Sequence, residues 1–344
     1  TRMIQTVMDS ESTEIELDSD TAAYKINAGQ TGFYRVRYED RKDFDALGRL
    51  ILDGTLPPED RWGLQNDLFN LVRSGVAAID DYLSFLSYYV NEDAYLPISS
   101  IAGNLFQSYL VFEGETKANI AAAGKSLLEK SLSRMGYEPL SDEPFTITLL
   151  RDQVIFPVVL YGSEDASQFF GEKFKALISG ESVHADILKS VMQVGALNGN
   201  NGTYTWLKER FESSASEHER MNILAAFGCF SDRELIEKSL QYSLDEVPDR
   251  NKFIPIVAMS SNPYAVDSMW DWYVAHLSEL EQFHPMLYER VIAGIVPVGG
   301  IGKTNRVRAF FEKYIQQHPQ TTEVVKLSLE KLEINLRMKE RLRR

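Results

Sequence analysis

The sequence predicts a mainly α-helical protein, an irregular α-solenoid of HEAT-like or armadillo-like character that follows a short N-terminal β segment. Three observations predict this class. The spacing of apolar residues changes from alternation to a helical period near Asp40. Helix start and stop signals then recur about every twenty residues to the C-terminus. At 344 residues the chain also exceeds the usual size of one hydrophobic core, which favours two domains or an elongated repeat.

Residues 1–38 are expected to hold about four short strands. Apolar and polar residues alternate around Ile15 and Leu17 and again around Tyr24 and Ile26. Polar loops at 9–12 and 18–20 separate these runs. So few short strands make a thin sheet that needs another layer to cover it.

A loop at 27–32 joins the expected strands. Asn27, Gly29 and Gly32 are residues that tolerate positive φ, as tight loops require. The aromatic and β-branched run at 33–38 then suits a last strand before the helices begin.

Residues 39–344 are expected to form paired helices with short connections, about fifteen in all. Leu64, Leu68 and Val72 share one helical face, and Tyr82 and Leu86 do so in the next helix. Helix ends are indicated by glycines where the periodicity stops: Gly75, Gly114, Gly136, Gly162, Gly180 and Gly228. Pairs at this spacing predict a solenoid with a concave inner face, and the repeats are irregular because no consensus recurs.

Two motifs resemble the zinc aminopeptidases of the aminopeptidase N type. Residues 27–39 match the signature N-x-G-x-x-G-[FY]-Y-R-V-x-Y-[DE], and residues 60–75 read DRWGLQNDLFNLVRSG. In that family the first motif lies near the end of a small β-sandwich domain, and the second lies in the first helices of a helical C-terminal domain. The resemblance therefore implies that residues 1–38 are the tail of the sandwich and that residues 39–344 are the helical domain.

The resemblance also implies a function. The helical domain of that family folds over the catalytic domain, encloses the cleft and limits substrate size, so the implied partners are an upstream catalytic domain of the same polypeptide and a peptide substrate. Zinc is the cofactor of the parent enzyme, and its ligands belong to a preceding thermolysin-like domain. We therefore expect no catalytic, cofactor-binding or metal-binding residue in this chain and no activity from it alone. The start at Thr1, inside a strand-like segment, is what a piece of a longer chain would show.

Charge and cysteine content narrow the classes of partner. Lys and Arg number 36 against 50 Asp and Glu, a net charge of -14 that disfavours nucleic acid and anionic membranes as partners. The lone Cys229 lies in an apolar run and is expected to be a small buried residue. The longest apolar runs are too short to span a bilayer, and the N-terminus lacks signal-peptide anatomy. A single thiol does not indicate the cellular compartment of the protein. We expect a cytoplasmic location.

Residues 297–304 end like a phosphate-binding loop, with Gly302, Lys303 and Thr304 in the last places. Pro297 occupies the position of the first loop glycine and lacks the N–H that a phosphate cradle uses. Too few residues follow for a nucleotide-binding sheet. We therefore interpret this stretch as a glycine-rich connection between two helices.

His218 and Glu219 begin like the H-E-x-x-H zinc helix, but Asn222 stands in place of the second histidine. A tetrahedral zinc site needs three protein ligands, and the other histidines have no ligand spacing. The same residues are explained by a capping box that begins at Ser216.

Arg151 is the one charged residue that we single out as a possible lining of a substrate cleft. It lies in an apolar helix expected over 145–160, so it either pairs with a carboxylate from a neighbouring helix or points into a polar cavity. Pairing is the favoured alternative, because a buried arginine is rarely unpaired. Aromatic residues such as Tyr82, Trp206 and Trp270 are candidates for a cleft by type, but at helical spacing they are more often core.

The alternative function is a free-standing helical-repeat scaffold that binds protein partners on its concave face. In that case the N-terminal strands are a small cap and the two motifs are coincidental. An upstream reading frame that contains H-E-x-x-H and a distal glutamate separates the two hypotheses.

Overall fold

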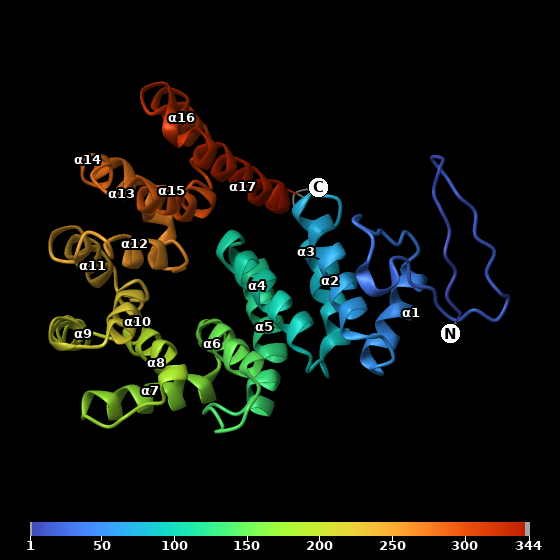
Figure 1. Ribbon diagram of the computed structural model, residues 1–344, viewed down its shortest axis with the longest axis horizontal. Coiled ribbons are helices and arrows are strands. Elements are labelled where there is room, and N and C mark those ends of the chain that lie inside the picture. The colour runs from blue at the N-terminus through green and yellow to red at the C-terminus, as the bar shows by residue number, and fades with distance from the viewer. Residues whose placement is uncertain (1, 341–344) are drawn as a thin grey trace.

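The computed structural model describes residues 2–340, and within them it is helical and contains no strand (Figure 1). The predicted mainly α-helical, solenoid-like class is confirmed. In chain order the α-helices are α1 (Arg41–Leu52), α2 (Pro58–Arg73), α3 (Ile79–Leu86), α4 (Tyr95–Val111), α5 (Gly114–Met135), α6 (Phe145–Leu160), α7 (Glu164–Ile178), α8 (Ala185–Leu197), α9 (Asn201–Ser213), α10 (Glu217–Phe227), α11 (Arg233–Asp245), α12 (Phe253–Met259), α13 (Val266–Ala275), α14 (Leu277–Leu280), α15 (Pro285–Gly299), α16 (Thr304–Gln317) and α17 (Thr322–Glu340). Short 3-10 helices are η1 (Ala28–Gln30), η2 (Ser87–Tyr89) and η3 (Pro319–Thr321).

The helices form two layers around a ring. The inner layer consists of α2, α4, α6, α8, α10, α12, α15 and α17, each of which contacts the next, and α17 also contacts α2. Most of the remaining helices pack on the outside, such as α7 on α8, α11 on α12 and α16 on α17. In Figure 1 the chain runs round from α2 through green and yellow helices to the red α17, whose end lies near α2 and α3. The inner layer is therefore closed, whereas the sequence predicted only a concave face.

A buried asparagine helps α17 to close the ring. The Asn335 side chain is 2% exposed, and its Nδ2 donates to the Pro297 carbonyl of α15 (2.9 Å). Its Oδ1 accepts from Gln107 Nε2 of α4 (3.1 Å). The Pro297 carbonyl needs this outside donor because the Ile301 N–H, its ordinary helical partner, donates to Val298 instead. One side chain thus joins three inner helices that are distant in sequence.

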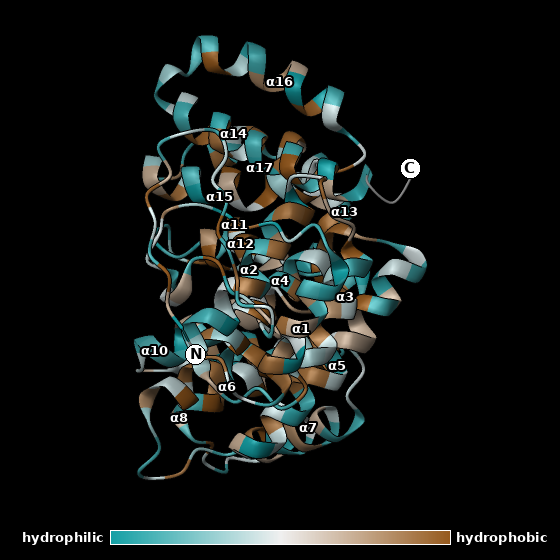
Figure 2. Ribbon diagram, turned by 90° about the vertical axis from the view of Figure 1, so that its right-hand side faces the viewer, coloured by the Kyte–Doolittle hydropathy of each residue, from teal (hydrophilic) through white to brown (hydrophobic). Residues whose placement is uncertain are grey.

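The amphipathic pattern of the helices explains why they pack in layers. Figure 2 shows apolar and polar residues interleaved along most helices, as expected where one face is buried and the other is solvated. The apolar faces merge into one continuous core, which includes Leu64 and Val72 of α2 and Val325 and Leu332 of α17. No single described helix is long and apolar enough to cross a membrane, although α6 and α7, bent by 110°, pass that test of length and composition as a pair.

The N-terminal segment differs from the expected β segment. Residues 2–26 run out and back as an extended loop away from the helices (Figure 1). Arg2 and Asp18 bridge its two arms at 3.2 Å, but no backbone ladder joins the arms within the described residues. Apolar side chains such as Met3 and Val7 are more than 80% exposed. Strands need hydrogen-bonded neighbours and a covered face, and this segment has neither here.

Candidate functional site

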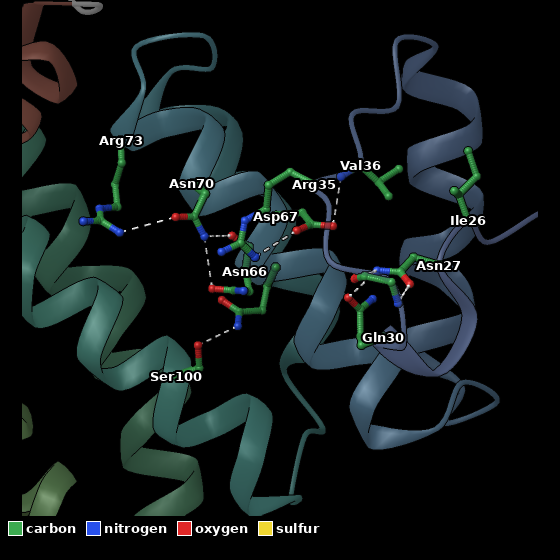
Figure 3. Close-up of polar contacts among 12 residues, drawn as sticks. Ile26, Asn27, Gln30, Arg35, Val36, Asn66, Asp67, Asn70, Arg73 and Ser100 are labelled. Carbon is green, nitrogen blue, oxygen red and sulfur yellow. Dashed lines mark hydrogen bonds and ion pairs between the residues drawn. The ribbon is translucent and has the colours of Figure 1, made fainter. Parts of the chain in front are cut away.

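The loop at 27–32 is closed by its own asparagine side chain. Asn27 has φ 58 and Gly29 has φ 70, so both adopt the left-handed conformation that the loop sequence predicted. Asn27 Oδ1 accepts from the Gly32 N–H (2.7 Å), and Asn27 Nδ2 donates to the Gly32 carbonyl (3.1 Å). The first and last residues of the loop therefore hold one another. Figure 3 shows Asn27 beside Gln30, whose Oε1 also accepts from Asn27 Nδ2 (3.3 Å).

Two buried carboxylates of α2 fasten this loop and the residues after it to the helical domain. Asp60 Oδ1 accepts from the Gly29 N–H (2.7 Å) and lies 3.4 Å from Lys25 Nζ. Asp67 Oδ2 accepts from the Val36 N–H (3.2 Å). Seven residues separate the two aspartates, which places both on one face of the helix, two turns apart. The two sequence motifs are thus the two halves of one interface.

Charge and shape both fit this interface. Burial lowers the pKa of the Lys25 amino group, and the adjacent Asp60 carboxylate acts in the opposite direction. Gly63 lies between the two aspartates, and a Cβ added there would meet the Gln30 side chain at 1.8 Å. The Gln30 side chain therefore occupies the space above Gly63, and a side chain at residue 63 would require Gln30 to move. Arg61, in the same motif, pairs with the buried Glu92 at 2.7 Å.

A polar row continues along α2 beyond Asp67. Asn70 Nδ2 donates to the Asn66 carbonyl (2.7 Å), and Arg73 Nη1 donates to Asn70 Oδ1 (3.3 Å). Arg35, from the segment that leads into the helices, reaches Asp67 at 3.3 Å. Figure 3 shows these side chains side by side, with Arg35 and Arg73 on either side of the asparagines. The sequence analysis missed Asp60, Asp67 and Arg73, although the 7-residue spacing of the two aspartates, which places them on one helical face, was a visible signal.

One cavity lies beside these elements, and another lies elsewhere among the helices. One of about 700 Å³ lies between the segment around Tyr38, α2 and α3, and Leu68 and Phe85 are among its lining residues. The other, of about 560 Å³, lies where α4, α5, α13, α16 and α17 approach one another. Lys117 and Lys303 are among the lining residues of the second cavity.

Arg151 lies in the core. Its side chain is 1% exposed and forms an ion pair with Glu143 at 2.5 Å. Its remaining donors reach the Met135 and Gly136 carbonyls at 3.0 and 2.9 Å. Of the two alternatives that the sequence left open, the geometry is that of carboxylate pairing, and the partner comes from the loop before α6. Hydrogen bonds from Arg151 lower the pKa of Glu143 to about 2.

The aromatic residues considered as possible lining of a substrate cleft differ in how far they are buried. Tyr82 and Trp270 are buried, at 0% and 1% exposure, and belong to the core. Trp206 packs edge-on against Phe174 and is partly buried. Cys229 is also buried, and burial raises the pKa of its thiol to about 12.

The stretch that resembles a phosphate-binding loop connects two helices. It begins in the last turn of α15 and ends at the first residue of α16, whereas a phosphate-binding loop follows a strand. Lys303 Nζ donates to the Asp267 carbonyl and lies 3.2 Å from the Asp271 carboxylate. The lysine is therefore committed to α13.

The stretch at 216–222 does not fit a zinc ion. Ser216 Oγ accepts from the Glu219 N–H as the N-cap of α10. Glu219 itself accepts from Arg210 (2.8 Å) and from Ser214 Oγ (2.5 Å). Within residues 2–340, no group of three or more His, Cys, Asp or Glu side chains is placed to hold a metal ion.

Comparisons with known proteins match most of the chain. The family model of the ERAP1-like C-terminal domain matches residues 23–334. Aminopeptidase 2 of Candida albicans is 26% identical over 77% of this chain and 29% of its own length. The alanine/arginine aminopeptidase of Saccharomyces cerevisiae is 26% identical over 90% of this chain and 37% of its own length. The leucyl aminopeptidase of Saccharolobus solfataricus is 22% identical over 98% of this chain and 41% of its own length. The chain therefore spans less than half the length of these relatives.

Proposed function

Because the chain belongs to the ERAP1-like C-terminal domain family, we propose that it is the substrate-enclosing C-terminal domain of a zinc-dependent aminopeptidase that removes N-terminal residues from peptides. The observation that carries the proposal is the pairing of the two motifs. Asn27 closes the loop of the first motif by accepting from the Gly32 N–H. The N–H groups of Gly29 and Val36 in that motif donate to Asp60 and Asp67 of the second motif. A coincidental pair of motifs on a free-standing scaffold has no reason to dock in this way.

We assign catalysis and substrate enclosure to different domains of the parent polypeptide. Glu219 and Lys303, the two most suggestive chemical groups of the sequence, are committed to internal partners. Hydrolysis and zinc binding are therefore assigned to an upstream catalytic domain of the parent polypeptide, with residues 1–38 as the tail of an intervening β-sandwich. This chain contributes a wall around the peptide, and alone it is inactive.

The closed inner layer supports a role in limiting substrate size. Contact between α17 and α2, together with the hydrogen bond between Gln107 of α4 and Asn335 of α17, closes the row of inner helices into a ring. Repeat arrays with contacts only between neighbours can open easily, whereas a closed layer resists opening. A wall of this kind admits an unfolded peptide and excludes a folded protein.

A fusion substrate tests the enclosure in the parent polypeptide. The same octapeptide is offered free, joined directly by its C-terminus to ubiquitin, and joined through a flexible linker of about 20 residues, which spans roughly 25 Å. We expect the free and linker-joined peptides to lose their N-terminal residues and the directly joined peptide to resist. Equal hydrolysis of all three would contradict the enclosure, and an aminoacyl-p-nitroanilide serves as the control for an intact active site.

A further inference from the structure

Four aromatic rings line the cavity of about 700 Å³ between the segment around Tyr38, α2 and α3. Tyr38 stacks on Phe44 and Phe44 stacks on Phe85, with ring centroids 5.9 and 3.9 Å apart. Tyr88 of η2 meets Phe85 edge-on at 5.7 Å. The Tyr88 ring also covers Gly48 of α1, where an added Cβ would meet it at 2.4 Å. The four rings therefore form one aromatic wall that is held by α1, α3 and η2.

The faces of this aromatic wall have no cation from the protein itself. Lys or Arg side chains lie over six rings elsewhere in the described chain, such as Arg220 over Phe211 at 4.5 Å. Within residues 2–340, none of the four rings of the wall is covered in this way. The face of an aromatic ring attracts a cation, and more strongly where water is excluded. The wall is therefore suited to a positively charged ligand.

Two carboxylates beside the wall are only weakly paired. Asp45 Oδ1 accepts from the Tyr88 hydroxyl (3.3 Å), which places this carboxylate at the edge of the wall. Its ion pair with Arg41 is long, at 3.9 Å, and Arg41 is 83% exposed. Asp81 accepts from the Ala78 N–H (3.1 Å) and has no ion-pair partner among the described residues. Because exposed ion pairs contribute little, both carboxylates can accept from a ligand.

The balance of charge around the cavity favours a cation. Its charged lining residues are four carboxylates and two guanidinium groups, namely Glu39, Asp45, Asp67 and Asp81 against Arg37 and Arg41. Asp67 is already engaged by Arg35 and by the Val36 N–H, which leaves three carboxylates against two guanidinium groups. The chain as a whole carries a net charge of -14. A field of this sign concentrates cations and repels anions.

The apolar part of the lining comes from α2. Leu64, Leu68 and Leu71 all contribute to it. Small-molecule sites occupy about 300–1,000 Å³ and combine an apolar lining with a few polar groups, and this cavity has that size and composition. An alkyl or aryl group that packs against the leucines leaves water, which favours binding in proportion to the apolar area buried. The cavity is therefore matched to a compact amphipathic molecule.

We propose that this cavity binds a small organic ammonium ion that carries an alkyl or aryl group. The ammonium group lies at Asp45 and Asp81 against the aromatic wall, and the apolar group packs on the leucines of α2. The lining combines residues 36–41, which lead out of the N-terminal segment, with α2 and α3. The bound ion therefore stabilises the attachment of that segment to the helices. This binding requires neither a peptide nor hydrolysis, so it goes beyond the proposed function.

Titration calorimetry on residues 1–344 tests the site with 2-phenylethylamine. The controls are 2-phenylethanol, which has the same shape without the charge, and ethylamine, which has the charge without the ring. We expect 2-phenylethylamine to bind at one site per chain, and each control to bind at least about tenfold more weakly because it lacks one of the two contributions. If the alcohol binds as tightly as the amine, the charge is not recognised. If 2-phenylethylamine shows no saturable binding, the site is refuted.

Variants locate the binding of 2-phenylethylamine. Asp45→Asn combined with Asp81→Asn is expected to weaken it by about tenfold or more, since hydrogen bonds to a charged group are the stronger ones. Asparagine keeps an oxygen acceptor for the Ala78 N–H, so the fold is preserved. Asp249→Asn removes an equal charge from a side chain that is 96% exposed and is expected to change nothing. A folded double variant that binds like the wild type would overturn the assignment.

The aromatic wall is tested separately. Tyr88→Leu is expected to weaken binding, whereas Tyr88→Phe keeps the ring and is expected to retain most of the affinity. Equal affinity of the two variants would exclude a role for the ring face. If Tyr88→Leu is unfolded by circular dichroism, the two asparagine substitutions decide the question, because both carboxylates reach solvent.

A last probe distinguishes a free amine from the N-terminus of a peptide. Phenylalanyl-alanyl-alanine amide carries the same ammonium and phenyl groups at the end of a chain. We expect it to bind more weakly than 2-phenylethylamine, because the cavity is matched to a compact molecule. Binding of the peptide that is as tight as that of the amine would contradict a free amine as the ligand.

Discussion

Glu143 and Arg151 illustrate at the residue scale how a charge is accommodated in the helical core. The sequence alone showed that Arg151 interrupts an apolar helix and needs a partner, and pairing was the favoured alternative. It did not identify Glu143, because the partner lies in the loop at 136–144 and loop paths are not encoded in apolar periodicity. Asp60 and Asp67 were missed for a related reason. Besides Lys25 and Arg35, their partners are backbone N–H groups, which leave no sequence signal of their own.

Glu143 gives a prediction about acid stability. Its pKa is about 2 in the folded chain against 4.5 for an unperturbed glutamate, so the unfolded state binds the proton more tightly. The stabilisation is therefore fully present above about pH 4.5 and is lost as the pH falls toward 2. A shift of this size sets an upper bound of about 3 kcal/mol on the contribution to the free energy of unfolding, and solvent screening lowers the contribution. Urea titrations between pH 6 and pH 3 check it.

Glu143→Gln is the matched variant for that measurement. It removes the titrating group but keeps a hydrogen-bond acceptor for Arg151. We expect the variant to be less stable than the wild type at pH 6 and to lose less stability on acidification. Parallel pH profiles for the two proteins would show that Glu143 does not titrate as described.

At the scale of elements, two helices matter most: α2 binds the loop at 27–32, and α17 closes the ring by contacting α2. The period of Leu64, Leu68 and Val72 was enough to predict α2, but not the role of Gly63 in receiving the loop at 27–32. The contact of α17 with α2 could not be predicted, because pairing between residues more than 200 positions apart depends on the accumulated curvature of all the helices between them.

Asn335→Ala tests the closure by α17. The substitution removes two hydrogen bonds of a buried side chain and leaves the Pro297 carbonyl without its donor. We expect a loss of about 1–3 kcal/mol in the free energy of unfolding. Asn119→Ala, an exposed change inside α5, is the control and is expected to be neutral or slightly stabilising. Hydrogen exchange provides the second readout.

In the exchange experiment, an open ring is expected to show faster exchange in α17 and in the facing part of α4 than in α8, which lies elsewhere in the ring. Uniform acceleration over all helices of Asn335→Ala would mean that the side chain supports general stability and has no particular role in closure.

At the scale of the whole molecule, the class of the fold could be predicted because helical periodicity and helix ends are local signals. The two-layer ring could not, since it is a sum of many small rotations between neighbouring helices. The strands expected in residues 1–38 are not formed in the structure, and the exposed Met3 and Val7 show why: alternation predicts a strand only where a neighbour supplies the ladder. The family resemblance rested on the two motifs, and the structure shows them in contact.

The central proposal is that this chain is the non-catalytic, enclosing domain of an aminopeptidase. The most direct measurement compares hydrolysis of alanyl-, leucyl- and glutamyl-p-nitroanilide by residues 1–344 alone and by the proposed longer polypeptide that carries a catalytic domain, each loaded with zinc and then dialysed. The account predicts no turnover and no stoichiometric zinc for residues 1–344, and both for the longer polypeptide. One zinc per chain with turnover by residues 1–344 alone would contradict it.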